Sequence, residues 1–212
     1  MQTRELVRAF GVVGACAATV LAAAVLVGPR IQAANDDGND ESKIRQGFES
    51  APVPLNLAHK NRALVGLGSY IVNNQGECDG CHSAGPQTQY LPGGNPYFGQ
   101  PEQINPATYL GGGRDFGEYP GPGSPIHIFS RNLTPDHTGL PIGGDTFEEF
   151  EHTIRTGHDP DQLHPNLPPP FRGDLLQIMP WPAYRNMTDR DLRAIYEYLS
   201  AIPCVPGPGH VC

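Results

Sequence analysis

Two cysteines and a histidine stand close together in the run C-D-G-C-H over Cys78–His82. Two thiols at this spacing can add to the two vinyl groups on one edge of a porphyrin, and the adjacent imidazole then lies beneath the iron. The run occurs once in the chain. It therefore predicts one covalently bound haem c, attached through Cys78 and Cys81, with His82 as a ligand of the iron.

The same cysteine pair has two other interpretations. A redox-active dithiol would begin a helix that follows a strand, whereas a helix is expected to precede Cys78. Half of a zinc site would need a second pair of Cys or His ligands nearby, and no such pair stands out in the sequence. Haem attachment is the interpretation that agrees with the motif and with its position after a helix.

The second axial ligand decides what such a haem does, because a methionine sulfur raises the potential and closes the iron to small molecules. Besides Met1, the chain has Met179 and Met187. Met187 directly precedes the expected N-cap of the last helix, where an apolar residue often packs as a staple. Met179 lies in an irregular, proline-stiffened run, so we interpret it as the ligand. The alternatives are a gap-filling core methionine and ligation by His158 or His164.

Three helices are predicted around these residues. Apolar side chains recur at helical spacing over 56–73, just before the cysteines, and again over 145–155. The last helix follows Thr188, its expected N-cap, and ends before Pro203. Gly and Pro recur throughout 83–130, which predicts long irregular loops with at most a short hairpin.

The N-terminal region predicts export. Residues 1–34 carry Arg4 and Arg8 near their start and continue into an uncharged apolar run over 9–28, which is typical of an export signal. The run is close to the ~20 residues that span a bilayer, so an uncleaved membrane anchor is the alternative. Residues 35–51 are polar and acidic, which predicts a flexible linker, and 52–212 remain as the haem domain. Both alternatives place that domain in the periplasm, either soluble after cleavage or anchored to the inner membrane.

Charge and cysteine usage limit the partners and the redox state. The chain has 212 residues and a net charge of −8, without a cluster of Lys or Arg, so nucleic acid is not an expected partner. Cys204 and Cys212 lie close together at the end of the chain. An oxidising compartment favours a disulfide between them over two free thiols.

The sequence resembles class I monohaem cytochromes c. In that family a helix with a glycine and an aromatic residue, here Gly68 and Tyr70, leads to C-x-x-C-H and crosses a C-terminal helix. Further runs, over 130–136, 147–157 and 179–192, are similar to a single module of the cytochrome c subunits of periplasmic quinoprotein and molybdenum-type dehydrogenases.

This resemblance implies a mainly α fold, the cytochrome c fold, in which the N- and C-terminal helices cross beside one haem among long Gly/Pro-rich loops. It also implies ligation by His82 and Met179, with Arg131 or Asn132 near the haem propionates. We therefore predict a carrier, not an enzyme, that passes single electrons between redox partner proteins: a dehydrogenase donor and an oxidase or cytochrome acceptor. The alternatives are a haem-binding subunit of a dehydrogenase complex, and an open-site haem enzyme or sensor that binds peroxide or a diatomic gas.

Overall fold

The computed structural model describes residues 40–161 and 166–212. Residues 43–212 pack as one unit, separate from 1–42, and the description below concerns that unit. The predicted export signal over 1–34 lies outside the described residues. Across the described ranges, every helix is too short or too polar to cross a bilayer.

Helix α2 (Arg62–Tyr70) leads the chain toward the two cysteines. Its start is set by Asn61, whose side-chain oxygen accepts hydrogen bonds from the N–H groups of Ala63 and Leu64. The helix predicted over 56–73 therefore begins later than its apolar spacing indicates, because the cap at Asn61 decides where the helical hydrogen bonds begin.

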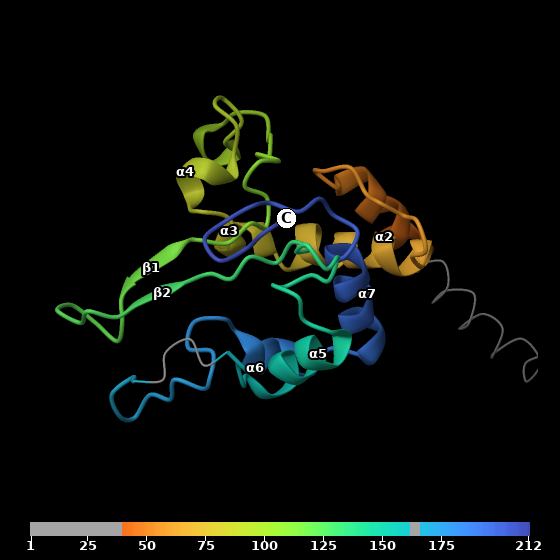
Figure 1. Ribbon diagram of the computed structural model, residues 1–212. Helices are drawn as coiled ribbons and strands as arrows, with labels where there is room; N and C mark the ends of the chain where they lie inside the picture. The colour runs from red at the N-terminus through yellow and green to blue at the C-terminus, as the bar shows by residue number, and fades with distance from the viewer. Residues whose placement is uncertain (1–39, 162–165) are drawn as a thin grey trace, which may run out of the picture. The chain divides into compact units, whose positions relative to one another are not determined.

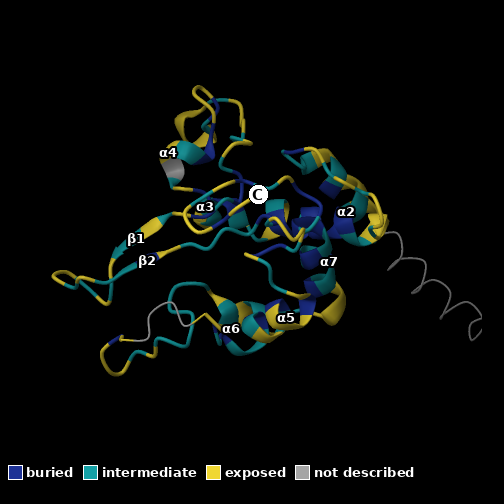
Figure 2. Ribbon diagram, viewed as in Figure 1, coloured by how far each residue is buried: buried dark blue, intermediate teal, exposed yellow. Residues whose placement is uncertain are grey.

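Helix α7 (Asp189–Leu199) crosses α2, and this contact is the most extensive one among helices α2 to α7. The crossing is close because Gly68 has no side chain: a Cβ there would stand 1.9 Å from the carbonyl oxygen of Ala194. Figure 2 shows buried residues concentrated where these two helices meet. Thr188 is the N-cap of α7, as predicted, and accepts a hydrogen bond from the N–H of Asp191.

The segment before the domain differs from its prediction. Residues 40–50 are helical, where the composition predicts a flexible linker over 35–51. The carbonyl of Gly47 accepts a hydrogen bond from the buried Ser69 hydroxyl at 2.6 Å, and a Cβ on Gly47 would stand 1.9 Å from the carbonyl oxygen of Gly66. Contact with α2 stabilises this helix, so the composition of the segment alone does not reveal it. The packed unit accordingly begins at residue 43, before the predicted boundary at 52.

The chain changes direction just before the cysteines. Helix α2 continues into a π-helical segment, η1 (Ile71–Gln75), which ends where the N–H of Gly76 donates to the carbonyl of Ile71 at 2.7 Å. Glu77 then adopts a left-handed conformation with φ of 46°, which is uncommon for a residue with a side chain. Helix α3 (Cys78–His82) follows, so the motif forms a separate short helix after the predicted one has ended.

The Gly- and Pro-rich region 83–130 contains two short helical turns, α4 (Pro86–Gln89) and η2 (Pro96–Phe98), followed by the predicted hairpin. Strands β1 (Asp115–Glu118) and β2 (His127–Phe129) pair antiparallel. The register places Asp115 opposite Phe129 and Glu118 opposite His127. In Figure 1 the hairpin extends from the side of the unit away from α2.

Helix α5 (Phe147–Thr156) confirms the second predicted helix. A capping box begins it: the Thr146 hydroxyl accepts from the N–H of Glu149, and the Glu149 carboxylate accepts from the N–H of Thr146. Gly157 ends it in a left-handed conformation. Helix α6 (Trp181–Tyr184) then precedes α7. After α7 the chain turns back, and Cys204 and Cys212 form the predicted disulfide.

Candidate functional site

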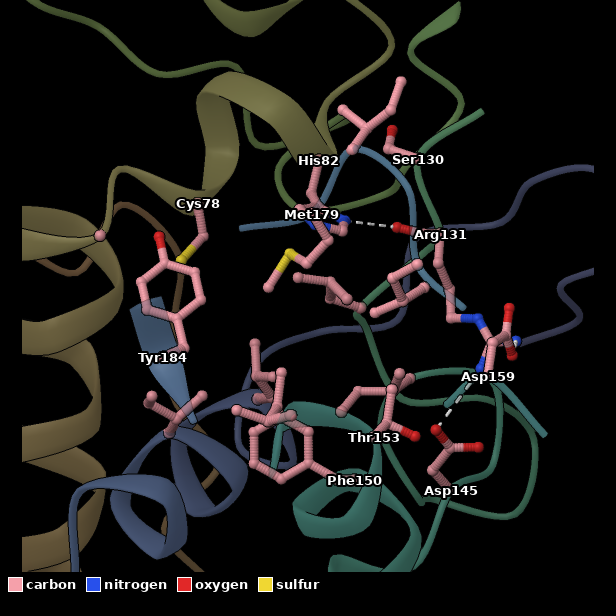
Figure 3. A pocket seen from close by; sticks show the side chains of 18 of the residues that line it. Cys78, His82, Ser130, Arg131, Asp145, Phe150, Thr153, Asp159, Met179 and Tyr184 are labelled. Carbon is pink, nitrogen blue, oxygen red and sulfur yellow. Dashed lines mark hydrogen bonds and ion pairs between the residues drawn. The ribbon is translucent and has the colours of Figure 1, made fainter. Parts of the chain in front are cut away.

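An apolar cavity lies between α3, strand β2, helices α5 and α7, and the segment 173–179 (Figure 3). Its apolar lining includes Val72, Ile128, Leu133, Phe150, Ile154, Leu192 and Leu199. Three of the four predicted haem-site residues line it as well, namely Cys78, His82 and Met179. The fold therefore brings Met179 to the same cavity as the motif, although a long stretch of chain separates them.

Helix α3 directs Cys78 toward the cavity, whereas Cys81 is exposed to solvent and is not part of the lining. Burial, followed by the neighbouring charges of Cys81 and Asp79, raises the pKa of the Cys78 thiol to about 12. The Cys78 thiol is therefore protonated at neutral pH. The two sulfurs differ in access: one faces the cavity and the other faces water.

The imidazole of His82 is held through one nitrogen. Its Nδ1–H donates to the carbonyl oxygen of Arg131 at 2.8 Å, since a carbonyl can only accept. This hydrogen bond leaves Nε2 as the nitrogen available to a metal. Burial lowers the pKa of His82, which keeps the ring neutral, as metal ligation requires. The backbone carbonyl of His82 is also engaged, by the N–H of Gly112 at 2.6 Å.

Two methionines line the cavity, Met179 and Met187. Met179 comes from the irregular segment before α6, and its carbonyl accepts a hydrogen bond from the N–H of Trp181 at 2.8 Å. The Trp181 ring is not part of the lining; it packs on Gly157, where a Cβ would stand 2.2 Å from the ring. Met187 packs against the hydrophobic core, which suits the predicted staple, and also reaches the cavity. The cavity thus contains two thioethers.

The histidines proposed as alternative ligands differ in position. His158 does not line the cavity: its Nδ1 lies 3.3 Å from a carboxylate oxygen of Asp174, and its ring stacks on His152 with centroids 6.3 Å apart. His164 lies outside the described residues. Among the histidines of the described segments, His82 alone is part of the cavity lining.

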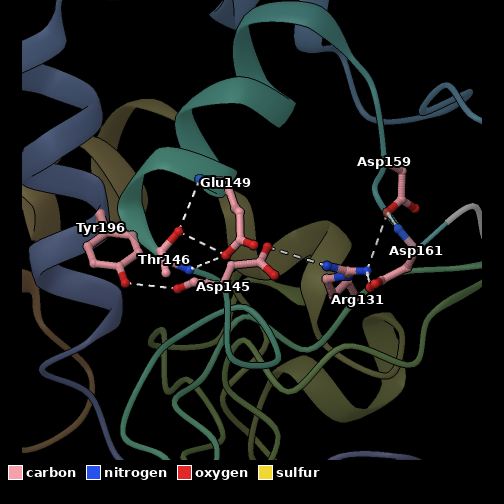
Figure 4. Close-up of polar contacts among 7 residues, drawn as sticks. All are labelled: Arg131, Asp145, Thr146, Glu149, Asp159, Asp161 and Tyr196. Carbon is pink, nitrogen blue, oxygen red and sulfur yellow. Dashed lines mark hydrogen bonds and ion pairs between the residues drawn. The ribbon is translucent and has the colours of Figure 1, made fainter.

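Charged groups gather around Arg131 at one end of the cavity, across from Cys78 in Figure 3. The guanidinium of Arg131 lies 3.4 Å from carboxylate oxygens of both Asp145 and Asp159, and it also pairs with Asp161 (Figure 4). Burial raises the pKa of Asp145 to about 6, and the charge of Arg131 opposes this shift. Sequence reasoning found Arg131 but missed the two aspartates that line the cavity beside it, because no local motif marks them.

Asn132 is not part of the cavity lining, and its Nδ2 donates to the carbonyl of Val205, near the end of the chain, at 2.7 Å. Of the pair Arg131 and Asn132, only Arg131 therefore lines the cavity.

Asp79, inside the motif, was not singled out by sequence reasoning. Its side chain is buried; Oδ1 accepts from the N–H of Leu110 at 2.9 Å, whereas Oδ2 has no hydrogen-bond partner. Burial raises the pKa of this carboxyl to about 6, although the hydrogen bond from Leu110 lowers it. The carboxyl therefore attaches the loop at Leu110 to α3, while its second oxygen is buried without a hydrogen bond, which is unfavourable.

The side chains present fit a haem. Apolar walls suit the porphyrin faces, Cys78 supplies a thiol at one end, and the guanidinium of Arg131, itself paired with carboxylates, lines the other end. The imidazole of His82 and the thioether of Met179 are the usual donors of a six-coordinate haem iron. This ligand set stays a prediction.

The chain is similar to cytochrome subunits of dehydrogenases, although no protein-family model matches it. It is 30% identical over 140 residues to the gluconate 2-dehydrogenase cytochrome c subunit of Pantoea cypripedii, which covers 65% of this chain and 23% of that protein. It is 31% identical over 139 residues to the cytochrome c subunit of a quinone alcohol dehydrogenase from Gluconacetobacter polyoxogenes, covering 64% and 21%. For the fructose dehydrogenase cytochrome subunit of Gluconobacter japonicus the identity is 28% over 151 residues, covering 70% and 23%.

These relatives are cytochrome subunits of dehydrogenases by name, and their similarity supports a cytochrome c of that kind. The chain spans less than a quarter of the length of each of the three.

Proposed function

We propose that this protein is a periplasmic c-type cytochrome that carries single electrons through one covalently bound haem, in a cytochrome c fold. The observation that carries this proposal is the meeting of Cys78, His82 and Met179 at one apolar cavity. The names of the relatives support the same function. Export in residues 1–34, by a cleaved signal or a retained anchor, is part of the proposal and comes from the sequence.

In this proposal Cys78 and Cys81 would hold the haem through thioether bonds, and His82 Nε2 and Met179 Sδ would be the donors to its iron. When bound, the haem supplies a one-electron couple between ferrous and ferric iron. The carbonyl of Arg131 orients the His82 ring, as the 2.8 Å hydrogen bond indicates. The apolar lining excludes water from the centre of the site, and the Arg131 side chain lies at its edge, paired with carboxylates.

A second candidate is a haem-binding subunit of a dehydrogenase complex, with the catalytic subunit as electron donor. The relatives favour it, because each is named as a subunit of a dehydrogenase. The two candidates share the same haem chemistry and differ in whether the chain acts as a free carrier. Size-exclusion chromatography of the protein purified from its own cells distinguishes them: a free carrier elutes alone, and a subunit elutes with dehydrogenase activity.

Mass spectrometry and optical spectroscopy of the purified protein test the haem assignment. We expect the mass of one covalent haem, a mature N-terminus that shows whether 1–34 is removed, and a six-coordinate ferric spectrum with the weak near-infrared band of methionine ligation. A five-coordinate spectrum with rapid binding of carbon monoxide would contradict a carrier and favour an open-site haem protein.

Met179 and Met187 provide a matched pair for the axial ligand, because both line the cavity. Met179→Leu should abolish the near-infrared band and lower the reduction potential, while Met187→Leu should leave the band in place. If Met187→Leu loses the band and Met179→Leu keeps it, Met187 is the ligand and the assignment of Met179 is wrong.

A further inference from the structure

The disulfide-closed end of the chain lies against the segment 132–137. The N–H of Val205 donates to the Thr134 hydroxyl at 3.0 Å, and the carbonyl of Val205 accepts from Nδ2 of Asn132 at 2.7 Å. Val205 is therefore joined to this segment through both of its backbone groups. Thr134 is fully buried, so its hydroxyl is in place to satisfy the N–H of Val205 without competition from water.

Two further contacts extend this attachment toward the disulfide. The buried ring of His210 donates from Nε2 to the carbonyl of Pro135 at 3.1 Å. The carbonyl of Val211 accepts from the N–H of His137 at 2.9 Å. Because the Cys204–Cys212 disulfide closes the chain around Val205, His210 and Val211, these groups are held together as one body.

The segment that the tail holds is continuous with the carbonyl that orients His82. Arg131, directly before Asn132, accepts the hydrogen bond from His82 Nδ1 at 2.8 Å. Gly112 contacts both His82 and the 131–132 backbone. Its N–H donates to the carbonyl of His82 at 2.6 Å, and a Cβ on it would stand 2.5 Å from the Asn132 nitrogen. Val205 packs on the adjacent Gly111, where a Cβ would stand 2.7 Å from the Val205 side chain.

A hydrogen bond to the second nitrogen of a metal-ligating histidine fixes its tautomer and ring orientation and increases its basicity. Any movement of the Arg131 carbonyl therefore changes how strongly His82 donates to a metal. The carbonyl itself belongs to a loop region, whose position depends on what packs against it.

We propose that the tail closed by Cys204–Cys212 is a brace that positions the proximal imidazole of His82, acting through Thr134 and Asn132 on the Arg131 carbonyl. Thr134 and Asn132 are positioning residues in this account. The inference rests on the proposed function, because the ring orientation of His82 matters for electron transfer only when a haem iron is bound there.

Thr134→Val tests the brace in the holoprotein, because it removes the hydroxyl while preserving shape and charge. We expect the His82 ring proton, followed by NMR in the ferrous protein, to exchange with solvent at least tenfold faster. The reduction potential should rise, since a weaker hydrogen bond makes the imidazole a poorer donor to ferric iron. Thr134→Ser keeps the hydroxyl and should restore both values. Thr138→Val makes the same chemical change at an exposed threonine, whose hydroxyl donates to the Asp136 carboxylate in its own loop, and should match the wild type.

Opening the disulfide gives a second, independent measurement. A Cys204→Ser/Cys212→Ser protein, or wild-type ferrous holoprotein treated with a thiol reductant, should show the same faster ring exchange. Wild-type exchange and potential in both Thr134→Val and the disulfide-opened protein would refute the brace, as would equal changes in Thr134→Val and Thr138→Val. If Thr134→Val does not fold, the reductant experiment on wild type decides. Absence of covalent haem would instead refute the proposed function, so the two failures are distinguishable.

Discussion

Gly68 in α2 lies against the backbone of Ala194 in α7, so closely that a Cβ on Gly68 would stand 1.9 Å from the Ala194 carbonyl oxygen. The obstructing atom belongs to a helix backbone and cannot rotate away. A side chain at Gly68 would therefore separate the two helices and disturb the buried residues around their crossing, which also form one wall of the cavity.

Gly68→Ala should destabilise the protein by about 3 kcal/mol or more, because overpacking against a rigid backbone forces the helices apart. Urea unfolding followed by circular dichroism measures the loss as a lower midpoint. Gly121→Ala is the matched control, since a Cβ at Gly121 would meet no atom within 4 Å. Equal midpoints for the two variants would show that α2 and α7 do not approach as closely as described.

Asp79→Asn should make stability less dependent on pH. The pKa of the Asp79 carboxyl is about 6 in the folded chain, against an ordinary value of 3.8 for an aspartate exposed to water. Between these values the folded state binds the extra proton, so the unfolding free energy of the wild type falls as pH rises from about 4 to about 6. The asparagine does not titrate, and it keeps an acceptor for the N–H of Leu110. Compared with the difference at about pH 4, the unfolding free energy of the variant above pH 6 should rise by up to about 3 kcal/mol relative to that of the wild type.

Denaturant unfolding at several pH values measures this difference. Asp145 also has a pKa of about 6, and its contribution cancels when the variant is compared with wild type. A constant difference between the two proteins from pH 4 to pH 7 would exclude a raised pKa at Asp79.

Arg131→Gln should raise the pKa of Asp145 above about 6, because the guanidinium opposes the effect of burial on that carboxyl. Carbon-13 NMR of the Asp145 side chain, titrated in wild type and variant, measures the change. Arg172→Gln removes an arginine that pairs with Asp174 instead, and should leave Asp145 unchanged. An Asp145 pKa that does not respond to Arg131→Gln would mean that the ion pair has little influence at this end of the cavity.

Features that depend on neighbouring residues could be predicted from the sequence. The spacing of Cys78, Cys81 and His82 is a local pattern, and the structure shows it as one short helix. The N-cap at Thr188 is likewise local, since a side chain and an N–H three residues on satisfy each other. The boundaries of elements depend on more than apolar spacing: Asn61 sets the start of α2, and contact with α2 makes residues 40–50 helical.

The sequence by itself determined that a thiol pair and an imidazole lie close together, because the three residues are near neighbours along the chain. Only the tertiary structure decided which distant groups join them. It brought both Met179 and Met187 to the cavity, excluded His158, and set the Arg131 carbonyl against His82. Outside 145–155 the intervening chain is rich in Gly and Pro and has no periodicity, so its path depends on packing and on hydrogen bonds between remote segments, which local residue patterns do not encode.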